Sequence, residues 1–277
     1  AGIDHAGTYT SEAERTQNGG VVLKTVSGMK IAIVAYTKGL GGLQLPEGAE
    51  YAVNLLYKDY STDYNKLDMS ALLDSVDAAK SLKPDIILVM LHWGSEATLE
   101  PTKTQESIAK QLFERGADAI IGSHSHLVGR METMDITTDD GKEKTCFVAY
   151  SLGNFFSSQN SSYASGCEES VILNLQFTKN GETGETTLTN ASYTPLYLLD
   201  SGKDDQLATL EGYIVQQVKH EKYMFRDSTG EMLVEIDDEV FKGQRVDPKT
   251  KVRIDGELER DFMEKDKVDV YNLTILR

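Results

Sequence analysis

Three of the five histidines stand where predicted strands end. His92 directly follows the apolar run Asp85–Leu91 (DIILVML), and His124 and His126 come a few residues after the apolar run Ala117–Ile121 (ADAII). A His-x-His pair on an extended loop presents two imidazoles from one segment, and a third can complete one face of a metal site. A lone histidine after a strand is more often a hydrogen-bonded surface or core residue. Three together predict a divalent metal site.

Two other polar residues near these histidines are candidates for catalysis. Glu96 follows His92 closely and could accept a proton, orient a histidine or bind metal, although an exposed loop carboxylate is an equally good interpretation. Asn154 could offer its amide to a metal or an oxyanion, although loop asparagines commonly satisfy turns. Gly94 and Gly122 would allow tight turns where a side chain would obstruct metal or substrate.

The remaining polar or aromatic residues of interest have weaker claims to a chemical role. Trp93, the single tryptophan, either walls the pocket or packs in the core. Ser123 and Ser125 lack an evident base and acid, so a serine nucleophile is not expected. His5 and His220 lie far from the other histidines along the chain, and we interpret both as ordinary surface residues.

Alternating strands and helices must position the three histidines. Apolar residues at spacings of three and four predict amphipathic helices over Leu67–Leu82 and Thr104–Arg115. Met29–Tyr36, Asp85–Leu91 and Ala117–Ile121 read as buried strands. This order predicts a parallel sheet with right-handed crossovers, in which sites lie beyond the carboxyl ends of the strands. We therefore expect the three imidazoles to share one pocket.

The other predicted elements divide the chain into two parts. Residues 1–200 form an α/β domain, and residues 201–277 form a charge-rich accessory α+β subdomain. The remaining predicted elements are a strand over Val21–Thr25 that pairs with Met29–Tyr36, a mobile rim loop at Lys38–Gln44, a strand over Thr145–Tyr150, a hairpin of Ser170–Phe177 and Glu185–Tyr193, a helix over Asp204–Lys219, and short strands at MLVEI and VYNLTIL.

Composition and charge exclude several classes of protein. The formal charge of −16 argues against an extended nucleic-acid surface. No apolar run reaches the ~18 residues that a membrane span needs, and the first residues lack the features of a signal peptide. We expect any targeting or anchoring segment to lie upstream of Ala1. Cys146 and Cys167 either pair with each other or, as we prefer, are independent thiols.

At these residues the sequence resembles a known family. LHWGSE (Leu91–Glu96), GADAIIGSHSH (Gly116–His126) and YSLGNFF (Tyr150–Phe156), in this order, resemble the capsule-synthesis protein A (CapA) family of poly-γ-glutamate production. That family is a branch of the calcineurin-like metallophosphatase superfamily. The resemblance spans approximately residues 1–159, and the ordered set is more specific than any one motif.

The resemblance implies a four-layer α/β/β/α sandwich with a two-metal site for Mn, Zn or Fe. His92 matches the isolated late histidine of the family, and His124 and His126 match its terminal His-x-His ligands. The family's earlier motifs, a Gly-Asp after the first strand and an Asn-His pair, are absent. We therefore expect a carboxyl-terminal part that lacks the first strands and is not a complete hydrolase, although three neutral imidazoles could still hold one ion. An exposed sheet edge would then be open to pairing in a homo-oligomer.

Three functions follow as hypotheses. The first is a metal-dependent hydrolase of capsular polymer assembly, extracytoplasmic at the cell surface or membrane-anchored, acting on an anionic polymer. The second is a non-catalytic scaffold or export component that binds the polymer or membrane synthase components. The third is an enzyme for a small phosphoester such as a nucleotide or sugar phosphate, although Lys38–Gln44 lacks the form of a phosphate-binding loop.

Overall fold

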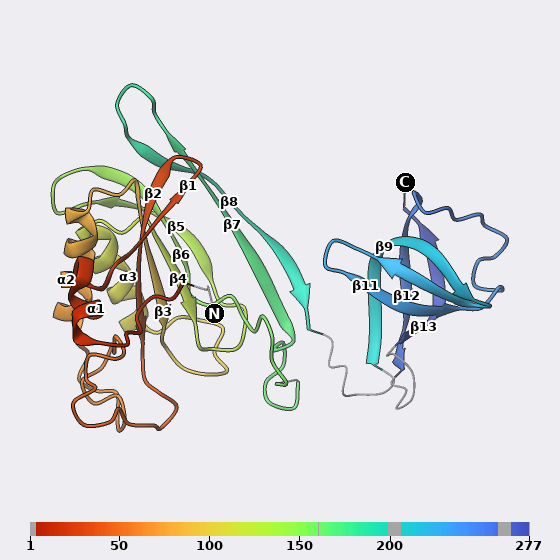
Figure 1. Ribbon diagram of the computed structural model, residues 1–277, viewed down its shortest axis with the longest axis horizontal. Helices are drawn as coiled ribbons and strands as arrows, with labels where there is room; N and C mark the ends of the chain where they lie inside the picture. Colours follow the sequence, from red (N-terminus) through yellow and green to blue (C-terminus); the bar gives the residue numbers. More distant parts are fainter. Residues whose placement is uncertain (1–3, 160, 199–205, 260–266, 277) are drawn as a thin grey trace. The chain divides into compact units, whose positions relative to one another are not determined.

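The computed structural model describes residues 4–159, 161–198, 206–259 and 267–276. They belong to two compact units, Ala1–Leu198 and Leu199–Arg277 (Figure 1). The domain boundary that the sequence predicts at residue 200 lies outside the described residues. Separate clusters of buried apolar side chains fill each unit, so each has its own hydrophobic core.

A six-stranded sheet forms the frame of the first unit, with the strand order β1-β2-β3-β4-β6-β5. Strands β2, β3, β4 and β6 run parallel, and the outer strands β1 and β5 pair antiparallel to their neighbours. The predicted parallel arrangement is therefore confirmed, whereas β5 is a strand that the sequence analysis missed. The bounds are β1 Val22–Val26, β2 Met29–Thr37, β3 Ile86–His92, β4 Ala119–Ser123, β5 Met131–Thr137 and β6 Glu143–Ala149.

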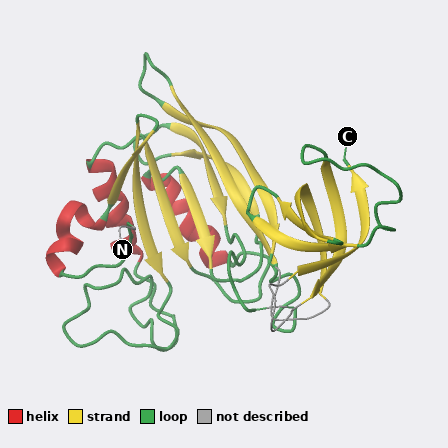
Figure 2. Cartoon of the chain, turned by 45° about the vertical axis from the view of Figure 1, so that its right-hand side comes forward, coloured by secondary structure: helices red, strands yellow, loops and turns green. Residues whose placement is uncertain are grey.

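Helices α2 (Met69–Ser81) and α3 (Lys103–Arg115) lie on one face of this sheet (Figure 2). Each buries one apolar stripe against the sheet, as the helical spacing predicts. Helix α3 ends at Gly116, whose φ of 128° lies in the left-handed region that favours glycine. A short helix α1 (Glu12–Thr16) and a 3₁₀ turn η1 (Gln17–Gly20) precede β1.

A capping box begins helix α3, and its removal gives a first prediction. The Thr102 side chain accepts from the backbone N–H of Gln105, and the Gln105 side chain accepts from the backbone N–H of Thr102. Thr102→Ala is expected to lower the free energy of unfolding by about 1 kcal/mol, because these end groups lose a partner. Urea denaturation followed by circular dichroism measures this change. Thr104→Ala, at an exposed position inside the helix, is the control, and an equal loss there would contradict the capping argument.

A long hairpin lies on the face of the sheet opposite the helices. Its strands β7 (Glu169–Lys179) and β8 (Thr186–Tyr197) confirm the predicted hairpin and pack Leu173 and Leu175 against a small apolar cluster of β4 and β6. Between sheet and hairpin lies an apolar groove of about 750 Å³. Met90 on the sheet side is 43% exposed and Ile172 on the hairpin side 45%, so this groove is only partly filled.

The second unit is a closed five-stranded barrel with the order β10-β11-β13-β12-β9. Its strands are β9 Gln206–Lys219, β10 Lys222–Arg226, β11 Glu231–Ile236, β12 Lys251–Glu259 and β13 Lys267–Ile275. The helix predicted over Asp204–Lys219 is wrong, because its described residues form β9. Alternate residues of that strand, including Ala208 and Ile214, are buried inside the barrel, so a period of two prevails over the helical period.

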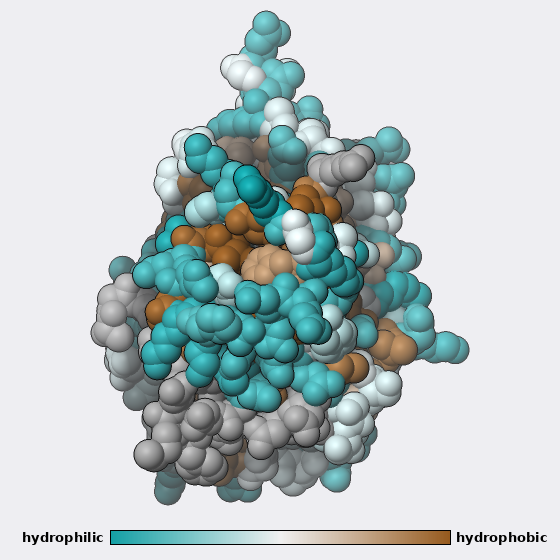
Figure 3. Space-filling view, turned by 90° about the vertical axis from the view of Figure 1, so that its right-hand side faces the viewer, coloured by the Kyte–Doolittle hydropathy of each residue, from teal (hydrophilic) through white to brown (hydrophobic). Residues whose placement is uncertain are grey.

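Both cysteines are buried, and the surface is mainly polar on the face shown in Figure 3. Cys146 and Cys167 are both free and buried, so the preferred interpretation of two independent thiols holds. Hydrophilic side chains predominate on the face shown in Figure 3, and hydrophobic ones gather near its centre. Among the described residues, no helix is long and apolar enough to cross a membrane.

Candidate metal site

The three histidines meet at the carboxyl edge of the main sheet. His92 is the last residue of β3, not the first after it, and pairs in register with Ser123 at the end of β4. The ring centroids of His92 and His124 lie 4.3 Å apart, and those of His124 and His126 lie 6.3 Å apart. Two adjacent parallel strands therefore bring all three imidazoles to one pocket.

The backbone at the His-x-His pair is held in an unfavourable conformation. His124 has a φ of 106° and His126 a φ of 64°, both in the region that favours glycine. Such a conformation costs of order 1–3 kcal/mol per residue and persists where the surrounding structure imposes it. Strain of this kind clusters at functional sites, so these two angles support a functional role for the loop.

A hydrogen bond from His92 to Thr37 determines which nitrogen of His92 faces the pocket. The Thr37 hydroxyl donates to the Gly39 carbonyl at 2.9 Å and lies 3.0 Å from Nδ1 of His92. Because its one proton is used on that carbonyl, the hydroxyl accepts from Nδ1–H of His92. Nε2 of His92 then carries a free lone pair, which is the form that binds a metal.

Asn154 fixes the ring of His126 in the same manner. Its Nδ2 donates to the carbonyl of Cys167 at 3.0 Å, which places Oδ1 2.9 Å from Nδ1 of His126. Oδ1 can only accept, so His126 donates from Nδ1–H and keeps Nε2 free. Asn154 thus contacts a candidate metal ligand. Its predicted catalytic role, in which its amide would contact a metal or an oxyanion, stays a prediction.

The pocket favours neutral imidazoles. Burial, together with the neighbouring His92 and Lys38, lowers the pKa of His124 to about 4. Burial also lowers the pKa of His92. Neutral rings are the form in which histidine binds a metal, so both are available as ligands near pH 7.

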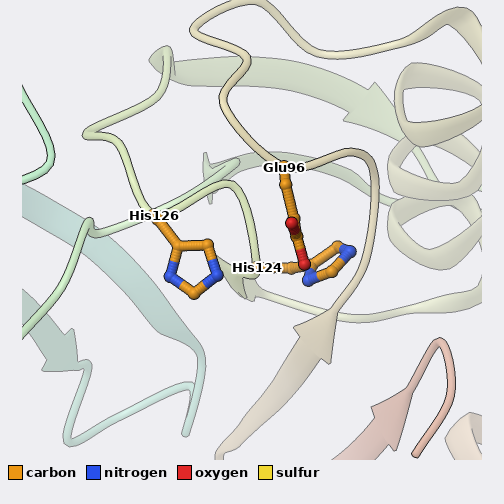
Figure 4. Close-up of side chains that lie close together, drawn as sticks. All are labelled: Glu96, His124 and His126. Atoms are coloured by element: carbon orange, nitrogen blue, oxygen red, sulfur yellow. The ribbon is translucent and has the colours of Figure 1, made fainter. Parts of the chain in front are cut away.

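Glu96 completes a group of three possible metal ligands. The ligand atoms of Glu96, His124 and His126 all lie within 4.8 Å of one another, and Figure 4 shows the carboxylate directed toward His124. The Tyr163 hydroxyl donates to this carboxylate at 2.6 Å. That hydrogen bond is the main cause that lowers the pKa of Glu96, with burial opposing it. Glu96 is therefore an anion that is already oriented.

The predicted rim loop, together with Tyr64 and Ser95, lines the rest of this pocket of about 650 Å³. Lys38 donates from Nζ to the Gly94 carbonyl at 2.7 Å and lies over the ring of Tyr64. The predicted rim loop Lys38–Gln44 does border the pocket, through Gly41 and Gly42 among others. Lys38 therefore adds one positive charge beside the three imidazoles.

The two glycines selected from the sequence lie at closely packed positions. A Cβ on Gly122 would lie 2.1 Å from the Tyr150 carbonyl oxygen, and one on Gly94 would lie 2.6 Å from the Gln105 side chain. Trp93 is 1% exposed and donates to the same Tyr150 carbonyl at 3.1 Å. The core interpretation of Trp93 is therefore correct. Gly94 has a φ of 80°, so the predicted tight turn is present there.

The donor set fits one divalent metal ion. Two imidazoles and a carboxylate are common ligands of zinc and manganese, which they bind at distances of about 2.0–2.2 Å. His92 lies beside this group as a possible fourth donor. One other group of this kind occurs among the described residues, at His220, Glu221 and Asp238, and there His220 is 78% exposed.

The fold and site define an α/β domain with a histidine-rich pocket at the carboxyl edge of its sheet, followed by a closed five-stranded barrel. Residues 1–159 match the family of the bacterial capsule synthesis protein PGA_cap, and residues 177–275 match that of the bacterial OB fold (BOF) protein. The chain therefore belongs to the bacterial capsule synthesis protein PGA_cap family, as the sequence resemblance predicted. It also carries a bacterial OB-fold domain, which the sequence analysis did not identify.

Individual relatives divide in the same way along the chain. The calcium-regulated OB-fold protein CarO of Pseudomonas aeruginosa is 35% identical over 114 residues, which cover 41% of this chain and 91% of CarO. The capsule biosynthesis protein CapA of Bacillus anthracis is 26% identical over 49% of this chain, and the PGA biosynthesis protein CapA of Bacillus subtilis is 31% identical over 38% of it. The matches cover 29% and 24% of these two CapA proteins.

Proposed function

We propose that this chain binds one divalent metal ion through Glu96, His124 and His126, and uses it on an anionic substrate during capsular polymer assembly. The observation that supports this most strongly is the convergence of these donors, with the His126 tautomer already fixed by Asn154. A bound ion would supply Lewis acidity and a water of lowered pKa. Glu96 can accept a proton from that region, and Lys38 favours the approach of an anion.

The names of the relatives support the same setting. Two relatives are CapA proteins of capsule or PGA biosynthesis, which suggests poly-γ-glutamate as the polymer and an extracytoplasmic location. Membrane synthase components would then be partners. We further propose that the sheet, its helices and the hairpin are part of a four-layer α/β/β/α sandwich.

A binding role without catalysis is the second candidate function. The likeness of the second unit to OB-fold proteins favours it, because barrels of this kind commonly bind polymers. The formal charge of −16 would repel a polyanion unless a bound cation bridges the two. This candidate therefore also requires metal, but it predicts affinity without turnover.

Metal loading followed by a substrate screen separates the two candidates. The full chain, stripped with EDTA and reloaded with Mn²⁺, Zn²⁺ or Co²⁺, is expected to hold about one ion that requires His124. Hydrolysis of bis-p-nitrophenyl phosphate or of γ-glutamyl oligopeptides by the loaded protein would support the first candidate. Inertness at full loading, together with metal-dependent affinity for poly-γ-glutamate in calorimetry, would support the second. A chain that retains no ion after reloading contradicts both.

A further inference from the structure

We propose that Tyr163 is a positioning residue of the candidate metal site, where its hydroxyl holds the Glu96 carboxylate in the orientation that a metal ligand requires. This inference rests on the proposed metal site and adds a residue to it. Tyr163 lies 67 positions after Glu96 in the sequence and outside the residues 1–159 that match the capsule family. It therefore lies in the segment between the end of the family match and the start of β7 at Glu169.

The contacts of Tyr163 reach two of the three candidate ligands. Its hydroxyl donates to Oε2 of Glu96 at 2.6 Å, and its ring meets the ring of His126 edge to face at a centroid distance of 5.7 Å. A carboxylate has two oxygens, so Oε1 of Glu96 stays available to an ion while Oε2 is engaged. The tyrosine thus restrains the carboxylate without occupying its full capacity.

The same segment also holds His126 through its main chain. The carbonyl of Cys167 accepts from Asn154, and Asn154 in turn accepts from His126. Glu168 accepts a hydrogen bond from the backbone N–H of Ser161 and so closes this loop on itself. Residues 161–168 therefore anchor both the carboxylate ligand and one imidazole ligand, from a part of the chain that contributes no ligand.

Orientation matters here because Glu96 stands on an exposed loop. A glutamate side chain has several free torsions, and fixing them when a metal binds opposes binding. A partner that already fixes the side chain removes most of this loss, and such partners typically change metal affinity 10–100-fold. The proposal therefore predicts weaker metal binding, not a failure to fold, when only the hydroxyl is removed.

Tyr163→Phe tests the proposal, because it keeps the ring beside His126 and deletes only the hydroxyl. Calorimetric titration of the full chain with Co²⁺ is expected to show affinity reduced roughly tenfold. The visible absorption of bound Co²⁺ is expected to change in intensity, since it depends on ligand geometry. Tyr193→Phe, at an exposed tyrosine of β8, is the matched control and is expected to leave both measurements unchanged.

A double-variant comparison separates positioning from a general effect on the fold. In a Glu96→Ala background, Tyr163→Phe is expected to cause no further loss of Co²⁺ affinity, because its only route to the metal is gone. An equal loss in both backgrounds would overturn the inference. If Co²⁺ binding requires His124 but Tyr163→Phe leaves the Co²⁺ affinity unchanged, the inference is overturned and the proposed metal site is not. Co²⁺ binding that is unaffected by His124→Ala overturns the proposed metal site and the inference together.

Discussion

Gly122→Ala is expected to destabilise the first unit by about 3 kcal/mol or more. The new methyl group would stand 2.1 Å from the carbonyl oxygen of Tyr150 and 2.6 Å from Nε1 of Trp93. Neither neighbour can move easily, because Tyr150 directly follows β6 and Trp93 is fully enclosed in the core. Moving either one would also break the hydrogen bond between them.

Urea denaturation followed by tryptophan fluorescence measures this effect, since Trp93 is the single tryptophan and lies at the point of the clash. Gly181→Ala is the matched control, because a Cβ at Gly181 meets no atom within 4 Å. A Gly122→Ala protein with wild-type stability would show that β4 and β6 can separate at this edge. The positions of the three histidines at this edge would then not be fixed by the packing of β4 against β6.

His124→Ala is expected to weaken divalent metal binding at the first unit by more than about 100-fold. Loss of a residue that merely orients a ligand already costs 10–100-fold, and His124 is the central ring of the group. Calorimetry with Zn²⁺ or Co²⁺ on the EDTA-stripped chain measures the change. Folding is expected to survive, because alanine removes a half-buried ring and leaves no buried charge.

His220→Ala provides the control for that experiment. His220 belongs to the exposed group with Glu221 and Asp238 in the second unit, where a weakly held ion could also contribute heat. The two variants together assign each binding event to one unit. Strong binding that disappears in His220→Ala and persists in His124→Ala would contradict the metal site at the sheet edge.

The parallel core was predictable because its sequence signals agree with its environment. Ile86–His92 is apolar without alternation, as a strand covered on both faces should be, and the residues of α3 repeat with the helical period. The antiparallel strand β5 (Met131–Thr137) was missed, since it lies at the sheet edge and has no fully buried residue. Edge strands bury less of their surface and therefore leave a weaker pattern.

Strand β9 shows why the second unit was misassigned. Leu207, Leu210, Ile214 and Val218 stand three or four residues apart, which is a helical spacing. The buried positions instead alternate, and Gly212 lies among them, where a Cβ would meet the Arg226 carbonyl oxygen at 2.3 Å. This segment is a strand and not a helix because it pairs with β10 and β12 to close the barrel. Pairing with distant strands cannot be read from the local sequence.

The part of the site that lies at the ends of neighbouring strands was predictable. The histidines stand at strand ends, so topology alone predicts that they meet. Thr37 ends β2 and pairs in register with His92, so the same reasoning about strand ends could have selected it, and Lys38 begins the predicted rim loop. Tyr163 reaches the pocket from a loop 67 residues after Glu96, and no spacing connects these two residues. Contacts of this kind depend on the paths of loops, which follow from tertiary packing.

The positive φ angles of His124 and His126 impose a cost in stability on keeping histidine at these two positions. Glycine or asparagine would relieve the strain at either position, and the gain in stability would favour such replacements wherever the imidazoles had no task. A lineage that abandoned the pocket should therefore drift toward those two residues at both places. Histidines retained together in other branches would indicate that selection still acts on the chemistry of this loop.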